Sequence, residues 1–149
     1  MGQAQTFGGA KVALFLGQQL VVILRDEKPG LPYPGHWDFP GGGREGPETA
    51  FECMARECAE ELGLTLRGED VMWSRSFETE DGVNWFFVAQ LPESAVHGIV
   101  FGKEGQRWQL MGVGEYLDHP KAIQRFKDRL RVALDGGLRG FSQESPPLP

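Results

Sequence analysis

The sequence predicts an α/β/α sandwich, in which helices cover both faces of one β-sheet. Three segments, 11–16, 20–24 and 83–89, are apolar at successive positions, which is typical of strands buried on both faces. Two further segments, 48–62 and 120–134, have the apolar spacing of amphipathic helices, one for each face of the sheet. The chain of 149 residues, 40% of them hydrophobic, has the size and composition of a single globular domain.

The two ends of the chain differ in composition from the rest. Residues 1–9 show no apolar pattern, and residues 136–149 read GGLRGFSQESPPLP, which is rich in glycine, serine and proline. We therefore expect a flexible N-terminus over 1–9, one folded domain over 10–135 and a flexible C-terminal tail over 136–149.

Turn residues connect the expected strands in pairs. The Gly-Gln pair at 17–18 separates the first two strands by the two residues that a tight hairpin needs. The Glu-Asp-Gly turn at 80–82 joins an expected strand over 71–78 to the strand over 83–89. Two shorter apolar runs are predicted as additional strands, 98–101 and 107–111.

Both expected helices combine an apolar stripe with a glycine stop. In the first helix Pro47 suits the first turn, and Gly63 lies where helices commonly end in the left-handed conformation. The second helix is expected to stop at the glycine pair 136–137. The stripes consist of Phe51, Met54, Ala55, Cys58 and Leu62 in the first helix and of Ile123, Phe126, Leu130 and Ala133 in the second.

Charge and hydropathy exclude several classes of function. The chain has 15 Lys and Arg residues against 21 Asp and Glu residues, and this net charge of −6 disfavours general nucleic-acid binding. No apolar run approaches the roughly 18 residues of a membrane span, and the first residues lack a secretory signal pattern, so we expect a cytoplasmic protein without a membrane partner. Cys53 and Cys58 are expected to be reduced packing residues.

Acidic residues crowd the C-terminal end of the first helix. Glu57, Glu60 and Glu61 lie where the helix dipole disfavours carboxylates, and Glu57 and Glu61 are like charges at i, i+4. Arg56 is expected to pair with Glu52 or Glu60 at i±4, which leaves Glu57 and Glu61 uncompensated. Such a cluster becomes favourable when a hard divalent cation binds to it. A solvated acidic face is the alternative interpretation.

A glycine-dense loop precedes this helix. Residues 37–47 read WDFPGGGREGP, and a main chain without Cβ atoms can approach a metal ion or a phosphate closely. A tight connection between a strand and a helix is the simpler interpretation of such a run. Together with the acidic helix end, the loop favours a metal site.

The loop and the helix resemble the Nudix box, G-x5-E-x7-R-E-U-x-E-E-x-G-U, where U is usually aliphatic. Cys58 is the one departure, and a buried thiol behaves as a small hydrophobic group. Residues 37–40 are similar to the entry strand of that family, and residues 102–106 resemble a loop of its MutT-like branch that carries a glutamate reaching the metals. The fixed positions of the box are Gly42, Glu48, Arg56, Glu57, Glu60, Glu61 and Gly63.

This resemblance implies a mixed sheet between helices and a site for Mg²⁺, with Mn²⁺ as a second candidate. Glu57, Glu60 and Glu61 would be metal ligands, and Gly41 would offer its carbonyl oxygen. Glu104 would be a further ligand or the general base, and Glu57 is the other candidate for the base.

The remaining positions of the box have supporting roles by the same resemblance. Arg56 would orient the glutamates and so belong to the catalytic group. Glu48 would support the start of the helix, with an outer contact to the metal as a further role. Gly42 and Gly63 would be structural.

The resemblance also implies hydrolysis of the diphosphate bond in a nucleoside diphosphate linked to another moiety. Residues 79–81 occupy the region where sub-families for ADP-ribose and dinucleoside polyphosphates carry a proline or tyrosine, so we expect a (deoxy)nucleoside triphosphate or related small nucleotide. Arg25 is a candidate phosphate contact and Tyr33 a candidate wall of a base pocket. A solvated arginine and a stiff proline-rich loop are the alternatives.

Two other functions stay open. One is a Nudix-like domain without turnover that senses a nucleotide or binds a protein partner, although the complete set of box carboxylates argues against it. The other is a purely structural acidic domain. The expected partner is a small nucleotide, and the sequence also allows a homodimer.

Overall fold

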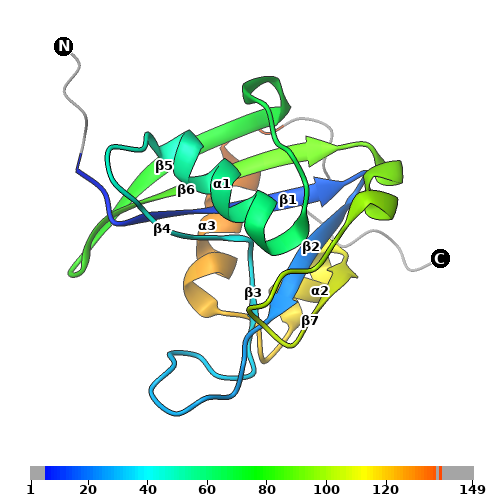
Figure 1. The fold of residues 1–149 in the computed structure, drawn as a ribbon, viewed down its shortest axis with the longest axis horizontal. Coiled ribbons are helices and arrows are strands. Elements are labelled where there is room, and N and C mark those ends of the chain that lie inside the picture. Colours follow the sequence, from blue (N-terminus) through cyan, green and yellow to red (C-terminus); the bar gives the residue numbers. More distant parts are fainter. Residues whose placement is uncertain (1–5, 137, 139–149) are drawn as a thin grey trace.

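A computed structural model of the chain describes residues 6–136 and residue 138 (Figure 1). Within this part, the strands form one mixed sheet with the order β3-β2-β1-β6-β5, and β4 and β7 pair with β1 and β2. The strands are β1 (Gly9–Leu16), β2 (Gln19–Leu24), β3 (Trp37–Asp38), β4 (Gly41–Gly43), β5 (Val71–Thr79), β6 (Gly82–Leu91) and β7 (Arg107–Met111). The helices are α1 (Ala50–Leu62), α2 (Val113–Asp118) and α3 (Gln124–Asp135), with short 3₁₀ helices η1 (Gly68–Asp70) and η2 (Glu93–Gly98).

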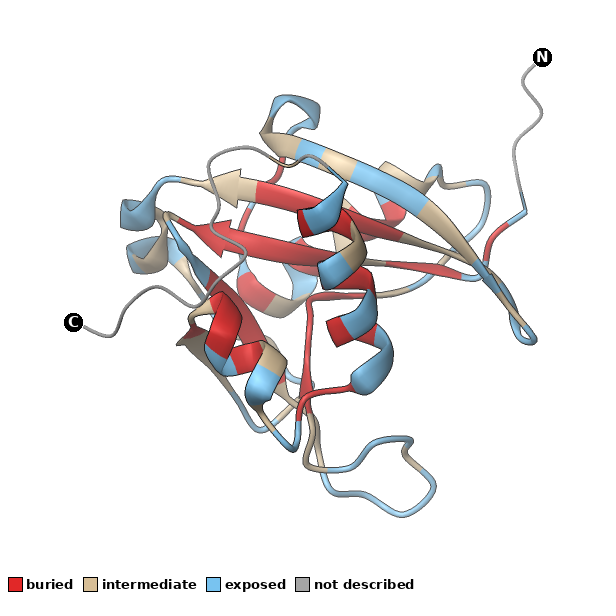
Figure 2. Ribbon diagram, turned by 180° about the vertical axis from the view of Figure 1, so that it is seen from behind, coloured by how far each residue is buried: buried red, intermediate tan, exposed pale blue. Residues whose placement is uncertain are grey.

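The centre of the sheet is buried on both faces, as predicted. β1 runs antiparallel to β2 and parallel to β6, and the Gly-Gln turn at 17–18 joins β1 to β2 with Gly17 at φ +64°. Ala13 and Phe15 of β1 belong to a core shared with α2 and α3, whereas Val12 and Leu14 belong to a core shared with α1. Helices therefore cover both faces (Figures 1 and 2), and the α/β/α sandwich is confirmed.

The expected strand over 98–101 is wrong. Residues 93–98 form η2, and the chain beyond it is irregular. Its amides instead cap α1: Val100 N donates to Leu62 O at 2.8 Å, and Gly102 N donates to Glu61 O at 2.9 Å. The segment thus satisfies helix carbonyls that would otherwise lack partners.

Both helix starts differ from the expectation. α1 begins at Ala50 rather than Glu48, after the N-cap residue Thr49. α3 begins at Gln124 rather than Pro120, because residues 121–123 pair with β3: Trp37 N donates to Lys121 O at 2.7 Å, and Ile123 N donates to Trp37 O at 3.3 Å. The helix α2 had no counterpart among the expected elements.

The folded part begins before residue 10. Phe7 is buried, Gly8 N donates to Val83 O at 2.8 Å, and Gly9 opens β1. Most of the expected C-terminal tail, residues 137 and 139–149, lies outside the described residues, as do residues 1–5. None of the helices in the described ranges is long and apolar enough to cross a membrane.

Candidate active site

The helix α1, which carries the glutamates, is capped at both ends. Thr49 Oγ1 accepts a hydrogen bond from Glu52 N, and Glu52 Oε1 accepts one from Thr49 N, which together form a capping box. At the other end Gly63 adopts φ +68°, and its N–H donates to Ala59 O at 2.9 Å. The T-x-x-E spacing at 49–52 is the sequence signal for this box, and our sequence analysis missed it.

Glu61 joins the end of α1 to the glycine strand β4. Gly41 N donates to Glu61 Oε1 at 2.9 Å. Burial raises the pKa of Glu61 to about 8, although Lys11 and the Gly41 amide act in the opposite direction. The carboxyl is therefore costly to ionise where it stands, and a bound cation would stabilise its charged form.

Glu57 lies beside the same strand. Burial raises its pKa, and its side chain is only 15% exposed. A Cβ atom at Gly42 would come within 2.5 Å of Glu57 Oε2, so the space for this carboxylate exists because residue 42 is glycine.

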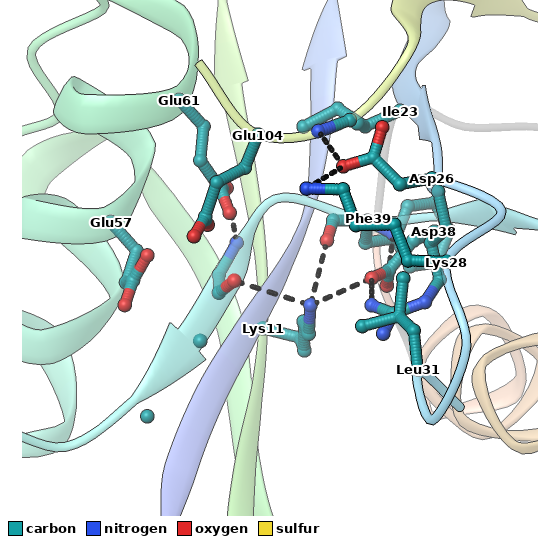
Figure 3. Close-up of a pocket in the computed structure, with 15 residues that line it drawn as sticks. Lys11, Ile23, Asp26, Lys28, Leu31, Asp38, Phe39, Glu57, Glu61 and Glu104 are labelled. Atoms are coloured by element: carbon teal, nitrogen blue, oxygen red, sulfur yellow. Dashed lines mark hydrogen bonds and ion pairs between the residues drawn. The ribbon is translucent and has the colours of Figure 1, made fainter. Parts of the chain in front are cut away.

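Glu104 reaches the site from a loop that is tied to two distant elements. Its neighbour Gly105 donates to Asp26 Oδ2 at 3.1 Å, and Gln106 N donates to Leu24 O at the end of β2 at 2.8 Å. These bonds bring Glu104 into one cavity with Glu57 and Glu61 (Figure 3). Its carboxylate has no hydrogen bond or ion pair with any residue that the structure describes.

Arg56 pairs with Glu60, one of its two expected partners, and also with carboxylates that were not expected. Its Nε lies 2.6 Å from Glu48 Oε2, and its Nη1 lies 3.3 Å from Glu57 Oε2 and 3.2 Å from Glu60 Oε1. The hydrogen bond from Arg56 lowers the pKa of Glu48. The prediction that Glu57 lacks a cationic partner is wrong, and Glu52 serves as a cap instead of pairing with Arg56.

Glu60 does not share the cavity of the other box glutamates. Its side chain is 59% exposed and lies on the Arg56 side of the helix. The structure thus brings together Glu57, Glu61, Glu104 and Gly41 of the predicted ligand set and leaves Glu60 at its edge.

A basic group also lines the cavity, and of its two members the sequence analysis named Arg25 but missed Lys11. Lys11 Nζ donates to Asp38 Oδ2 at 3.0 Å, to Phe39 O at 3.2 Å and to Gly41 O at 3.2 Å. Arg25 Nη1 donates to the same Asp38 oxygen at 3.0 Å, so two cations share one buried carboxylate. The one signal in the sequence is the single charge of Lys11 within an apolar strand.

Of the two predicted substrate contacts, Arg25 and Tyr33, only Arg25 lines the cavity. Tyr33 is not among the lining residues and is 45% exposed. Tyr33 contacts His36 edge to face and adopts φ +52°, which places it in the turn of an exposed loop. The structure therefore gives no support to Tyr33 as a wall of this cavity.

The cavity has a volume of about 330 Å³ and is lined by Glu57, Glu61 and Glu104 and by the group of Lys11, Arg25 and their shared partner Asp38. Among the described residues, no three His, Cys, Asp or Glu side chains are grouped closely enough to hold an ion as they stand. The chemistry of the donor atoms nevertheless fits a hard divalent cation, because the oxygens of Glu57, Glu61 and Glu104 line one cavity. The glycine strand β4 lies beside this cavity and has no side chains to fill it.

An α/β/α sandwich with acidic residues at a helix end beside a glycine strand is the arrangement that the resemblance to the Nudix box implies. The NUDIX domain model matches residues 7–130, and the chain belongs to the NUDIX family.

Solved structures show the same fold. A MutT protein from Methanosarcina mazei has a TM-score of 0.64 and 20% identity, over 86% of this chain and 93% of that one. An Ap4A hydrolase from C. elegans has a TM-score of 0.65 and 16% identity, over 87% and 99%. A bifunctional NMN adenylyltransferase/ADP ribose pyrophosphatase from Francisella tularensis has a TM-score of 0.69 and 16% identity. The match covers 92% of this chain and 43% of that protein, so this chain spans less than half of its length.

Proposed function

We propose that this chain is a Mg²⁺-dependent hydrolase that cleaves the diphosphate bond of a nucleoside diphosphate linked to another moiety, with a (deoxy)nucleoside triphosphate or related small nucleotide as the substrate. The observation that carries the proposal is the meeting of Glu57, Glu61 and Glu104 in one cavity, although they come from a helix and a distant loop. Membership of the NUDIX family supports it, and so does the complex of the Francisella enzyme with AMP and a manganese ion.

The metal would be held by the carboxylates of Glu57, Glu61 and Glu104 and by the Gly41 carbonyl. A divalent cation bound there would neutralise phosphate oxygens and lower the pKa of a nearby water. Glu60 stays a predicted ligand, and it would have to exchange its contact with Arg56 for the ion. Mn²⁺ is the second candidate for the site.

The residues of the chain contribute positioning and proton transfer. Arg25 lines the cavity with donors that can bind a phosphate oxygen and orient the diphosphate. A carboxylate must accept the proton of the attacking water, and the candidates are Glu57 and Glu104. Arg56 already holds Glu57, whereas Glu104 has no partner among the described residues, which favours Glu104.

The test is a release assay for phosphate and pyrophosphate over a nucleotide panel, with and without Mg²⁺. We expect Mg²⁺-dependent hydrolysis by the wild type and a loss of several orders of magnitude in Glu61→Gln. Glu69→Gln is the matched control, because Glu69 is an exposed carboxylate of η1 that does not line the cavity. Metal binding without hydrolysis of any nucleotide would favour the sensing domain, and absence of metal binding would favour the structural one.

A further inference from the structure

A second cavity adjoins the candidate active site. It has a volume of about 230 Å³ and shares Lys11, Gly42 and Gly43 with the first cavity. Its other polar side chains are Asn84 at the start of β6 and Arg125 and Arg129 of α3. None of the described residues that line it is a carboxylate. We call it the arginine pocket.

Arg129 is buried in this pocket without an anionic partner. It is only 5% exposed and has no hydrogen bond or ion pair with any described residue. Its Cζ lies 4.9 Å from the centroid of the Phe77 ring and 5.8 Å from that of Phe126. Ring faces compensate a buried guanidinium only in part, so its charge is costly unless an anion binds. Burial and the neighbouring Arg125 lower its pKa, in agreement with this cost.

Neighbouring positive charges make the buried charge of Arg129 still less favourable. Arg125 lies one turn earlier on α3, in the first turn of the helix, where no acidic residue is present. Two arginines at i, i+4 repel each other, and a cation in the first turn opposes the helix dipole. Lys11 Nζ lies 5.8 Å from the centroid of the Phe126 ring, so it approaches the ring that Arg129 also contacts.

We propose that the arginine pocket binds a second phosphate group of the substrate, outside the diphosphate bond that is cleaved. The inference rests on the proposed hydrolase function, because the group would belong to the same substrate. A guanidinium matches the geometry of phosphate oxygens in pairs, and a phosphate carries more than one negative charge, which suits a pocket with several cations. The shared wall of Lys11, Gly42 and Gly43 makes the two cavities neighbours, so one ligand can occupy both.

The first test is the binding of inorganic pyrophosphate by calorimetry in EDTA, where no metal contributes. We expect wild-type binding and a loss of at least about tenfold in affinity in Arg125→Gln and in Arg129→Gln. Arg131→Gln is the matched control, because Arg131 is an exposed arginine of α3 outside the pocket, and it should bind as the wild type does. Arg125 is exposed, so its variant keeps the test valid should Arg129→Gln fail to fold.

Wild-type affinity in Arg125→Gln, or equal losses in Arg131→Gln, would overturn the arginine pocket. The hydrolase proposal is tested separately, since Glu61→Gln should lose hydrolysis and keep pyrophosphate binding in EDTA. Hydrolysis with normal KM in Arg125→Gln and Arg129→Gln would refute the pocket alone. Pyrophosphate binding that depends on the two arginines, in a protein that hydrolyses no nucleotide, would refute the hydrolase alone.

Discussion

The main-chain amide of Gly41 donates a hydrogen bond of 2.9 Å to the carboxylate of Glu61. This bond joins the glycine strand to the end of α1, across 20 residues of sequence. The carbonyl oxygen of the same Gly41 is the predicted metal ligand, and it accepts a hydrogen bond of 3.2 Å from Lys11 Nζ. The bond from the Gly41 amide thus fixes the place of the Glu61 carboxylate in the metal-free protein.

The first prediction concerns the space that Gly42 leaves for Glu57. In Gly42→Ala the new Cβ would lie 2.5 Å from Glu57 Oε2, so the carboxylate must move. We expect Mn²⁺ affinity, measured by calorimetry, to fall about 10- to 100-fold, as when a supporting contact of a metal ligand is lost. Gly43→Ala is the control, because its Cβ would meet no atom closer than Gly8 O at 3.9 Å. Equal losses in both variants would contradict the prediction.

The second prediction is a pH dependence of the metal-free fold. The pKa of Glu61 is about 8 in the folded protein against 4.5 for the free group, so between these values the folded state retains a proton that the unfolded chain releases. The free energy of unfolding should therefore fall as pH rises from about 4.5 to 8, by an amount of the order of a few kcal/mol, and level off above that range. Urea unfolding in EDTA at several pH values measures it.

Glu61→Gln provides the control for this pH dependence. Glutamine cannot ionise, so the variant should be more stable than the wild type at pH 8 in EDTA and should lose most of the slope. Glu57, whose pKa is also raised, accounts for a remaining part. A wild-type stability that does not change over this pH range would show that Glu61 ionises normally.

The third prediction concerns Lys11. Lys11→Met leaves buried Asp38 with Arg25 as its cation and removes a positive charge that lowers the pKa of Glu61. We expect a loss of about 1–3 kcal/mol in the free energy of unfolding. The decrease with pH should also extend to higher pH than in the wild type. Lys28→Met is the comparison, since Lys28 is 71% exposed and its ion pair with Asp26 is 3.7 Å long, and it should cost less than about 1 kcal/mol.

The fourth prediction concerns the two thiols. Cys53 and Cys58 are free and fully buried on α1, and burial raises the pKa of Cys58 to about 12. Neither should react with a thiol reagent at pH 8 in the folded protein, whereas both should react in urea, because the thiolate is the reactive species. Rapid labelling of the native protein would mean that α1 detaches from the sheet or that the thiols are not packed as described.

Local spacing predicted much of the fold. The uninterrupted apolar runs predicted strands buried on both faces, and the stripe of Met54, Cys58 and Leu62 predicted the buried face of α1. The predictions from spacing were wrong where the backbone of one segment forms hydrogen bonds with a distant element. Residues 98–101 cap α1, and residues 121–123 pair with β3 before α3 begins.

The sequence by itself determined the class of fold, the family and the acidic end of α1, because residues three or four positions apart on a helix become neighbours by geometry. The tertiary structure decided which charges meet. Lys11 lies opposite Gly41 in the register of β1 and β4, and the loop of Glu104 is held by hydrogen bonds to Asp26 and to the end of β2. Arg129 lines one cavity with Gly42. These contacts join residues tens of positions apart, and sheet register and loop closure, which no local pattern encodes, determine them.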